Sequence, residues 1–255
     1  MKIALFLGLL FSVSVSQARV FNMGKETFGS YLRGTYGNWG QSKSPFENSS
    51  STVANPLTFN SGFKTLSSYE FGFIYATGVT TWRFGFELIQ PAKLKDLTGT
   101  NAAGTKMYDL GSEFSIVTPK MGIEFNLKTW KESRVFFYGD YGLANLTLQN
   151  SYAFTAAGTA AYPGMTDFRE ELKATTSTYS LNLAFETLMS DTTTICLEGG
   201  YRFLKFAEMK HNVAGTVFQG TVAKGDKAYN DDGTTARSLN LSGPYAGIHF
   251  RFWIN

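Results

Sequence analysis

One hairpin, over residues 67–90, limits the folds open to this chain more than any other stretch. Its first strand, residues 67–75, reads Ser-Ser-Tyr-Glu-Phe-Gly-Phe-Ile-Tyr, and its second, residues 81–88, reads Thr-Trp-Arg-Phe-Gly-Phe-Glu-Leu. Because side chains alternate along a strand, one face is a wall of aromatic residues and the other carries glycine and isolated charges. The wet face of a soluble sheet does not pair glycine with isolated charges in this way. The pattern is typical of a barrel in lipid, aromatic outside and small or charged inside.

Such a barrel must close, because an open sheet edge leaves unpaired backbone groups in hydrocarbon. The sequence supplies eight candidate strands, and the connections between them alternate strictly between long and short. Outer-membrane barrels place short turns in the periplasm and long loops outside the cell. We therefore predict an all-β fold, an eight-stranded antiparallel up-and-down transmembrane β-barrel with short periplasmic turns and four long extracellular loops. The predicted strands span residues 28–37, 67–75, 81–88, 110–127, 134–148, 176–189, 194–206 and 238–254.

Two irregularities are expected within this pattern. On the fourth strand, Phe114 and Ile116 have the opposite parity to Met121, and Pro119 lies between them. Proline lacks a backbone N–H, so we expect a β-bulge at Pro119 that lets both apolar sets face lipid. In the third long segment, residues 167–173 are expected to form one helical turn.

The first residues predict the compartment. A basic start is followed by an uncharged apolar run over residues 3–15 and by small residues up to Ala18. This order is that of a secretory signal, which we expect to be cleaved after Ala18, and it outweighs the alternative of a buried core helix. Residues 1–18 are then the signal peptide and residues 19–255 the barrel, located in the bacterial outer membrane.

Composition excludes several classes of function. The lone Cys196 excludes an intramolecular disulfide framework and a cysteine-based zinc site. A net charge of +3 implies no field that would attract nucleic acid. We expect no metal, no cofactor and no nucleic-acid partner.

Charged residues recur at the inward positions of the predicted strands. An eight-stranded barrel is only just wide enough to hold its own side chains, so opposite charges there must pair. We interpret them as a polar core that fills the lumen; the alternative is a gated ion path in which pairs exchange partners. The predicted lumen network is Arg33, Glu70, Arg83, Glu87, Lys120, Glu124, Asp140, Glu186, Glu198, Arg202 and Arg251.

Aromatic residues recur at the outward positions of the same strands. These side chains are expected to meet lipid tails and are Tyr69, Phe71, Phe73, Trp82, Phe84, Phe86, Phe137, Tyr141, Phe185, Phe203, Phe250 and Phe252.

The signal peptide, the strand rhythm and the closing stretch Gly-Pro-Tyr-Ala-Gly-Ile-His-Phe-Arg-Phe (residues 243–252) give the chain a family resemblance. It resembles the small eight-stranded outer-membrane barrels, the group of the OmpA transmembrane domain, OmpX and OmpW. The resemblance covers the whole mature chain. It implies outer-membrane lipid and lipopolysaccharide as surroundings, and the barrel-assembly machinery as a partner during insertion. In that group the assembly machinery recognises an aromatic residue at the C-terminal position. This sequence ends Phe-Trp-Ile-Asn, so Phe252 or Trp253 would have to take that role.

An enzyme is not expected. Some barrels of this size remove acyl chains from lipid A with a His-x-Ser pair on the lipid face, but His249 is followed by Phe250 and Arg251 and has inward parity. His211 lies in the last long segment without a neighbouring nucleophile. We therefore expect a structural or surface-interaction role through the long loops. The alternatives are a channel for small solutes or, as the likeness to OmpW implies, for hydrophobic molecules, and a lipid-modifying enzyme comes after these.

Two further alternatives concern the outer surface. A soluble barrel of lipocalin type would place the aromatic residues inside and the charges outside. Gly139 and Gly199 interrupt outward rows, which either lets copies of the barrel approach as a homo-oligomer or relieves crowding beside a large neighbour. The sequence does not choose between these two roles.

Overall fold

The fold is taken from a computed structural model, which describes residues 25–42, 58–59, 62–91, 94–218, 220–230 and 233–254. The predicted signal peptide and its cleavage site lie outside these residues and stay predictions.

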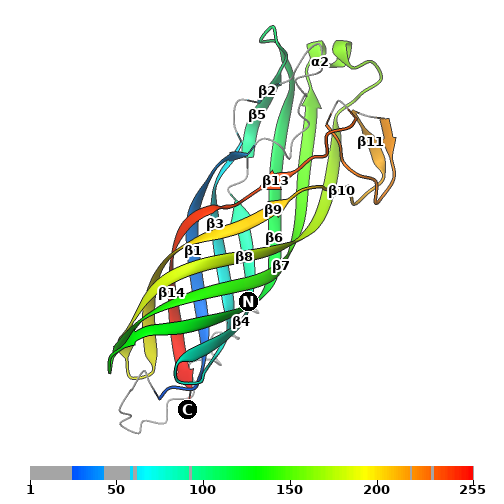
Figure 1. Cartoon of the computed structure of the whole chain (residues 1–255). Helices are drawn as coiled ribbons and strands as arrows, with labels where there is room; N and C mark the ends of the chain where they lie inside the picture. Colours follow the sequence, from blue (N-terminus) through cyan, green and yellow to red (C-terminus); the bar gives the residue numbers. More distant parts are fainter. Residues whose placement is uncertain are drawn as a thin grey trace, which may run out of the picture.

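Eight long strands form a closed antiparallel ring (Figure 1). Each strand pairs with its neighbour in chain order, and the last strand pairs with the first, from Phe28 opposite Ile254 to Gly37 opposite Tyr245. This closure leaves no free edge along the membrane-spanning part, as the backbone requires in lipid. The ring strands are β1 (Phe28–Ser42), β3 (Phe63–Ala76), β4 (Thr80–Pro91), β6 (Lys106–Thr129), β7 (Ser133–Phe154), β8 (Phe168–Ser190), β9 (Thr193–Phe206) and β14 (Gly243–Ile254).

The two ends of the barrel differ. At one end β3–β4, β6–β7 and β8–β9 are joined by tight turns; Gly78 supplies the positive φ of +83° in the first of them. At the other end β6, β7 and β8 rise beyond the ring and carry additional short elements (Figure 1). These elements are β2 (Thr58–Phe59), β5 (Leu94–Thr100), α2 (Ala156–Ala161), β10 (Lys210–His211), β11 (Gly215–Val217), β12 (Gly220–Val222) and β13 (Leu239–Asn240).

No helix among the described residues is long and apolar enough to cross a bilayer.

The bulge expected at Pro119 is wrong. The register of β6 against β7 continues without a shift from Val117 opposite Asn145 to Lys120 opposite Gly142, and the irregularity lies lower, between Asn126 and Lys128. Side chains at even-numbered positions of β6 therefore point inward from Tyr108 to Glu124, on both sides of Pro119. Phe114 and Ile116 belong to this inward set and are buried, so they do not face lipid.

The helical turn expected over residues 167–173 is also wrong. That stretch is the start of β8, which pairs with β7 from Phe168 opposite Tyr152 onward. The helix lies earlier, at α2, where Thr155 caps it by accepting a hydrogen bond from the Gly158 N–H at 3.1 Å. Much of the third long connection is thus a continuation of the sheet.

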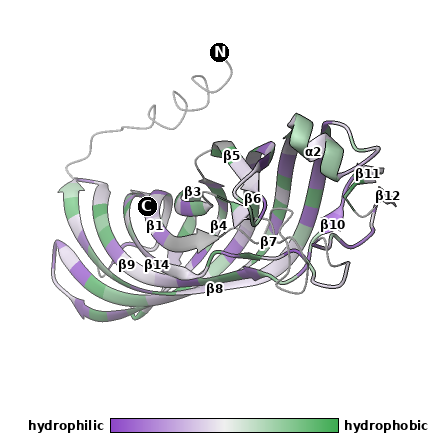
Figure 2. Cartoon of the chain, turned by 90° about the horizontal axis from the view of Figure 1, so that it is seen from above, coloured by the Kyte–Doolittle hydropathy of each residue, from purple (hydrophilic) through white to green (hydrophobic). Residues whose placement is uncertain are grey.

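The barrel interior has two zones of opposite character. Near the tight turns it is filled by charged side chains. Toward the extended end it is filled by a buried apolar cluster, here called the apolar core, which includes Phe114, Ile116, Leu146 and Leu172. Apolar and polar residues alternate in bands along the ring strands, as the hydropathy colours show (Figure 2).

Candidate functional site

The outer surface of the ring carries an apolar belt. Of the twelve aromatic residues predicted to meet lipid, nine are exposed large side chains, with Phe71 58% and Phe84 51% exposed, and Phe203, Phe250 and Phe252 are partly exposed. Such a continuous apolar surface is far beyond what a soluble monomer leaves open to water. Phe71 and Phe84 do not meet at a central axis, so the lipocalin-type alternative is excluded.

The belt ends at a defined level toward the extended end of the barrel. On β6 the outward residues change from apolar Val117 to Ser115 and Glu113, while the inward residues change from Lys120 to apolar Ile116. Strand parity stays the same, so the two faces exchange polarity at this level. This exchange marks the point at which the strands leave hydrocarbon and enter water.

Aromatic side chains border the belt on both sides. Trp130 lies at the β6–β7 turn, where the Lys128 ammonium is 5.1 Å from its ring centroid. Toward the other border, the outward Tyr141 and Tyr179 lie directly opposite each other, and the Tyr141 hydroxyl is 3.0 Å from Ser177 Oγ. Amphipathic rings at both water interfaces are typical of transmembrane barrels.

Inside the belt, the membrane-spanning strands carry a balanced set of buried charges. All eleven side chains of the predicted lumen network are buried, and Arg134 joins them. The twelve comprise six carboxylates and six cations, contributed by all eight strands of the ring. The carboxylates are Glu70, Glu87, Glu124, Asp140, Glu186 and Glu198, and the cations are Arg33, Arg83, Lys120, Arg134, Arg202 and Arg251.

Nearest the tight turns, two carboxylates and two guanidinium groups form a closed four-membered ring. Arg251 donates to Glu124 at 2.7 and 3.0 Å and lies 3.1 Å from Glu186, while Arg134 donates to Glu186 at 2.8 Å and to Glu124 at 3.1 Å. Each charge thus has two opposite neighbours. Since β14 and β6 lie opposite each other in the strand order, the Arg251–Glu124 pair crosses the full width of the lumen.

The middle of the lumen is centred on Arg33. Its guanidinium group donates to Glu70 at 2.6 Å and to Glu198 at 2.7 Å. Each of these two carboxylates also accepts a hydrogen bond from a buried tyrosine hydroxyl: Tyr31 donates to Glu70 at 2.5 Å, and Tyr138 donates to Glu198. Charge-assisted bonds of this kind satisfy lone pairs that would otherwise be costly to bury.

Above this level, Lys120 lies among three carboxylates. Its ammonium is 3.3 Å from Asp140 and 3.4 Å from both Glu70 and Glu87. Glu87 also accepts from Arg202, across the lumen, because β4 and β9 are opposite strands of the ring. Two ion pairs therefore bridge the bore at different depths, Arg251–Glu124 below and Arg202–Glu87 above.

The inward glycines of the opening hairpin make room for one phenol. Gly72 and Gly85 are directly paired on β3 and β4. A Cβ on Gly72 would lie 2.8 Å from the Tyr31 ring, and a Cβ on Gly85 would lie 2.4 Å from its hydroxyl. The combination of glycine with isolated charges thus arises because Tyr31 lies over the glycine pair and reaches Glu70.

The alternation of side chains along the strands predicted most of this network from the sequence, but it missed Arg134. Arg134 is the second residue of β7 and has the same inward parity as Tyr138 and Asp140. His249 lies inward as predicted, with Nε2 3.4 Å from Glu198 Oε2.

The two outward glycines do not relieve crowding beside an aromatic neighbour. A Cβ on Gly139 would be 3.6 Å from the Leu181 side chain, and a Cβ on Gly199 would meet nothing within 4 Å. Both positions are open toward lipid.

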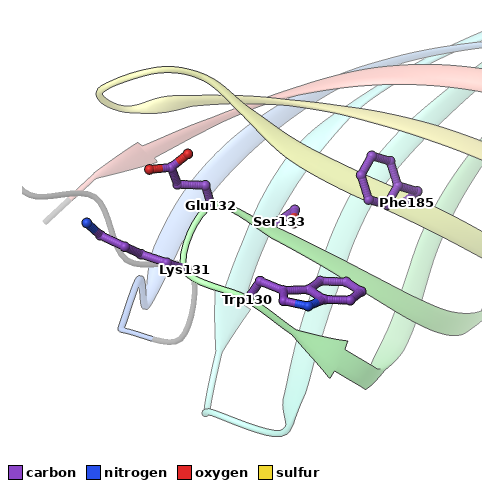
Figure 3. A pocket seen from close by; sticks show the side chains of 5 residues that line it. All are labelled: Trp130, Lys131, Glu132, Ser133 and Phe185. Atoms are coloured by element: carbon purple, nitrogen blue, oxygen red, sulfur yellow. The ribbon is translucent and has the colours of Figure 1, made fainter.

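One hollow lies outside the lumen, at the β6–β7 turn. It measures about 430 Å³ and is lined by Trp130, Lys131, Glu132, Ser133 and Phe185 (Figure 3). Phe185 belongs to the outward row, so this hollow opens to the lipid interface and not to the barrel interior. It offers no cluster of catalytic groups.

A closed eight-stranded ring with an apolar belt outside and paired charges inside defines this chain as an eight-stranded transmembrane β-barrel.

No family model and no curated protein sequence matches the chain. Among solved structures, it is similar to the outer membrane protein OprG from Pseudomonas aeruginosa, with 11% identity and a TM-score of 0.48 over 91% of this chain and 98% of that one. It is also similar to a major outer membrane protein from Thermus thermophilus, with 12% identity and a TM-score of 0.48 over 88% and 99% of the two chains. A third similar structure is the outer membrane protease OmpT from Escherichia coli, with 7% identity and a TM-score of 0.37 over 94% and 100%.

Proposed function

We propose that this protein is an integral outer-membrane barrel that does not conduct ions, and that it acts through the elements raised above its lipid belt. The observation that carries the proposal is the pair of ion bridges across the bore, Arg251–Glu124 and Arg202–Glu87. In a barrel that barely holds its own side chains, two such bridges at different depths leave no continuous water path.

Conductance in planar bilayers tests the proposal. Wild-type protein is expected to give no steady openings, whereas the double variant Glu87→Ala with Arg202→Ala removes one bridge and is expected to admit small ions. The matched control is Lys106→Ala with Asp109→Ala, which deletes a half-exposed ion pair of 2.7 Å on the surface of β6. Steady, large openings of the wild-type protein would overturn the proposal.

Passage of small hydrophobic molecules is the second candidate. The apolar core favours it, because the interior beyond the charged zone is lined by residues such as Phe114 and Leu146 and not by polar groups. Uptake of a hydrophobic dye into liposomes distinguishes the two: entry that rises with the amount of inserted wild-type barrel supports passage, and entry equal to that of empty liposomes excludes it.

A lipid-modifying activity is not part of the proposal. His249 lies inside the barrel beside Glu198, away from any acyl chain. A mass spectrum of lipid A from cells with and without the protein is expected to be unchanged, and loss of an acyl chain would restore the enzyme hypothesis.

The proposed surroundings are outer-membrane lipid and lipopolysaccharide, with the barrel-assembly machinery acting during insertion. Self-association is supported only by the open outward positions at Gly139 and Gly199. Cross-linking in native membranes would give a ladder if the barrels form a ring, and only monomer if they do not.

A further inference from the structure

The fourth long connection folds back over the inside of the extended wall. Near its start, His211 pairs with Leu172 of β8. Near its end, the buried Arg237 donates to Glu170, which also accepts from the Tyr152 hydroxyl at 3.0 Å. The two ends of this connection are therefore fastened to the barrel by ladder and ion-pair contacts.

The middle of the connection is attached differently. β11 and β12 pair only with each other, as a separate two-stranded sheet, and Phe218 follows directly after β11. An isolated two-stranded hairpin is at best marginally stable in water. At the base of the hairpin, the Asn212 N–H donates to the Glu171 carbonyl and the Gly225 N–H donates to the His211 carbonyl, both at 2.8 Å. Beyond this base, the attachment of the hairpin to the wall depends on the contacts that its side chains make there.

Phe218 supplies those contacts by entering a group of five aromatic rings, here called the aromatic box. The ring centroids of the box residues lie 5.1 to 5.6 Å from that of Phe218. Their planes are steeply inclined to it, at 44° to 87°, which is the favourable edge-to-face range for aromatic pairs. The box consists of Tyr108, Tyr152, Phe154, Tyr162 and Phe168.

The box is built from rigid elements. Tyr108 lies opposite Phe154 in the β6–β7 ladder, and Tyr152 lies opposite Phe168 in the β7–β8 ladder. Tyr152 and Phe168 also stack on each other, with centroids 4.6 Å apart. The fifth ring, Tyr162, follows α2 and is held by its backbone N–H, which donates to the Gly158 carbonyl at 2.9 Å. The walls of the box are thus fixed without help from Phe218.

We propose that the aromatic box is a binding site for a neutral, benzyl-sized aromatic group, and that Phe218 is an internal occupant which such a ligand displaces. A rigid box holding a ring on a hairpin that is hydrogen-bonded to the rest of the structure only near its base is the arrangement that permits exchange. The Tyr152 hydroxyl already donates to Glu170, so its polar end is satisfied and its ring face is what the box offers. The ligand is either a small aromatic molecule or the phenylalanine side chain of a peptide. This site lies above the lipid belt and does not depend on whether the lumen conducts.

Calorimetry on the full mature barrel in nanodiscs tests the site directly, with N-acetylphenylalanine amide for the peptide source and benzyl alcohol for the small-molecule source. A tethered competitor acts at an effective concentration on the order of millimolar, so Phe218→Ala is expected to tighten the apparent binding of a matching probe by about tenfold or more. The matched control, Val213→Ala, removes an exposed side chain of the same connection and is expected to bind as wild type. Adding Phe168→Ala to Phe218→Ala is expected to abolish the gain. The probe whose binding tightens in Phe218→Ala shows whether the natural ligand is a peptide phenylalanine or a small aromatic molecule. Equally weak binding of both probes to Phe218→Ala and to wild type would refute the site.

Proteolysis of the wild-type protein gives a second readout that needs no variant. Displacing Phe218 frees the hairpin, so N-acetylphenylalanine amide is expected to speed tryptic cleavage after the exposed Lys224, whereas N-acetylalanine amide is not. In Phe218→Ala the cleavage is expected to be fast already and insensitive to either amide. An unchanged rate in wild type at concentrations that saturate Phe218→Ala would show that Phe218 does not occupy the same site.

Discussion

Loss of Glu124 should damage the barrel strongly, because its carboxylate lies within 4 Å of three guanidinium groups. In the four-membered ring it accepts from Arg251 at 2.7 and 3.0 Å and from Arg134 at 3.1 Å, and the Arg83 guanidinium lies 3.6 Å away. Glu124→Gln keeps the shape of the side chain and removes its charge. Three buried cations then share fewer carboxylates, and breaking a buried ion pair in this way costs about 3–5 kcal/mol.

The experiment is equilibrium unfolding in denaturant, starting from protein folded in lipid and followed by tryptophan fluorescence. Glu132→Gln serves as the control, because Glu132 is exposed at the β6–β7 turn and its neutralisation should change the free energy of unfolding by no more than about 0.5 kcal/mol. Combining Glu124→Gln with Arg251→Met restores charge balance and leaves the Arg134–Glu186 pair at 2.8 Å intact. The double variant should therefore recover about 0.5–3 kcal/mol relative to the sum of the two single changes. A loss for Glu124→Gln no larger than that of the control would refute the view that the lumen charges are held by mutual pairing.

Three other outcomes follow from the same structure. Met121→Lys puts a charge on the lipid belt and should cost about 2–4 kcal/mol of unfolding free energy, whereas Ser115→Lys, on the same face of β6 above the belt, should cost little, and equal costs would mean that the belt is misplaced. Gly72→Ala should destabilise by about 1–3 kcal/mol in the same unfolding assay, since its Cβ would lie 2.1 Å from a carbonyl oxygen, while Gly34→Ala meets nothing within 4 Å and should be neutral. Burial lowers the pKa of His211, so the closed fourth connection favours the neutral imidazole. The neutral imidazole therefore stabilises the closed connection fully above about pH 6.5, and this stabilisation is lost as the pH falls further. The hydrogen-exchange protection factors of residues 207–218 and 220–230, which correct for the slower intrinsic exchange at low pH, should fall at pH 5 in wild type and much less in His211→Gln. Protection factors that do not change with pH in either protein would contradict this assignment.

The fold could be predicted from sequence because strand alternation needs no knowledge of partners. Tyr69, Phe71 and Phe73 alternate with Glu70 and Gly72, and the period of two alone assigns each to a face. The identity of each ion pair could not be predicted, because Arg251 and Glu124 lie on opposite strands of the ring and meet only through closure. Parity states which side chains enter the lumen and is silent on which carboxylate each cation reaches.

The extended end was predicted least well, because its side chains no longer meet lipid. The sequence predicts a helical turn at Phe168 and no strand at Phe218, since neither lies in a run with the aromatic-outside pattern of the belt. In the structure both belong to the aromatic box, where apolar residues point inward as in a soluble protein. A search for the reversed pattern, apolar at inward positions and polar at outward positions, would have extended β6, β7 and β8 correctly.

The error at Pro119 and the position of the membrane have one physical cause. A strand keeps its parity as long as its ladder is regular, but the solvent outside it changes from lipid to water along its length. When the outer solvent changes, the favourable side for apolar residues moves from the outer to the inner face without any shift in register. On β7, the outward row changes from Leu143 to Asn145 while the inward row passes from Asp140 to Leu146, at the same level as on β6. About ten residues separate this level from the tight turns, which is the length a tilted strand needs to cross the hydrocarbon core. An apparent break in apolar parity, in a strand with no break in its ladder, therefore locates the outer border of the bilayer and is not a sign of a bulge.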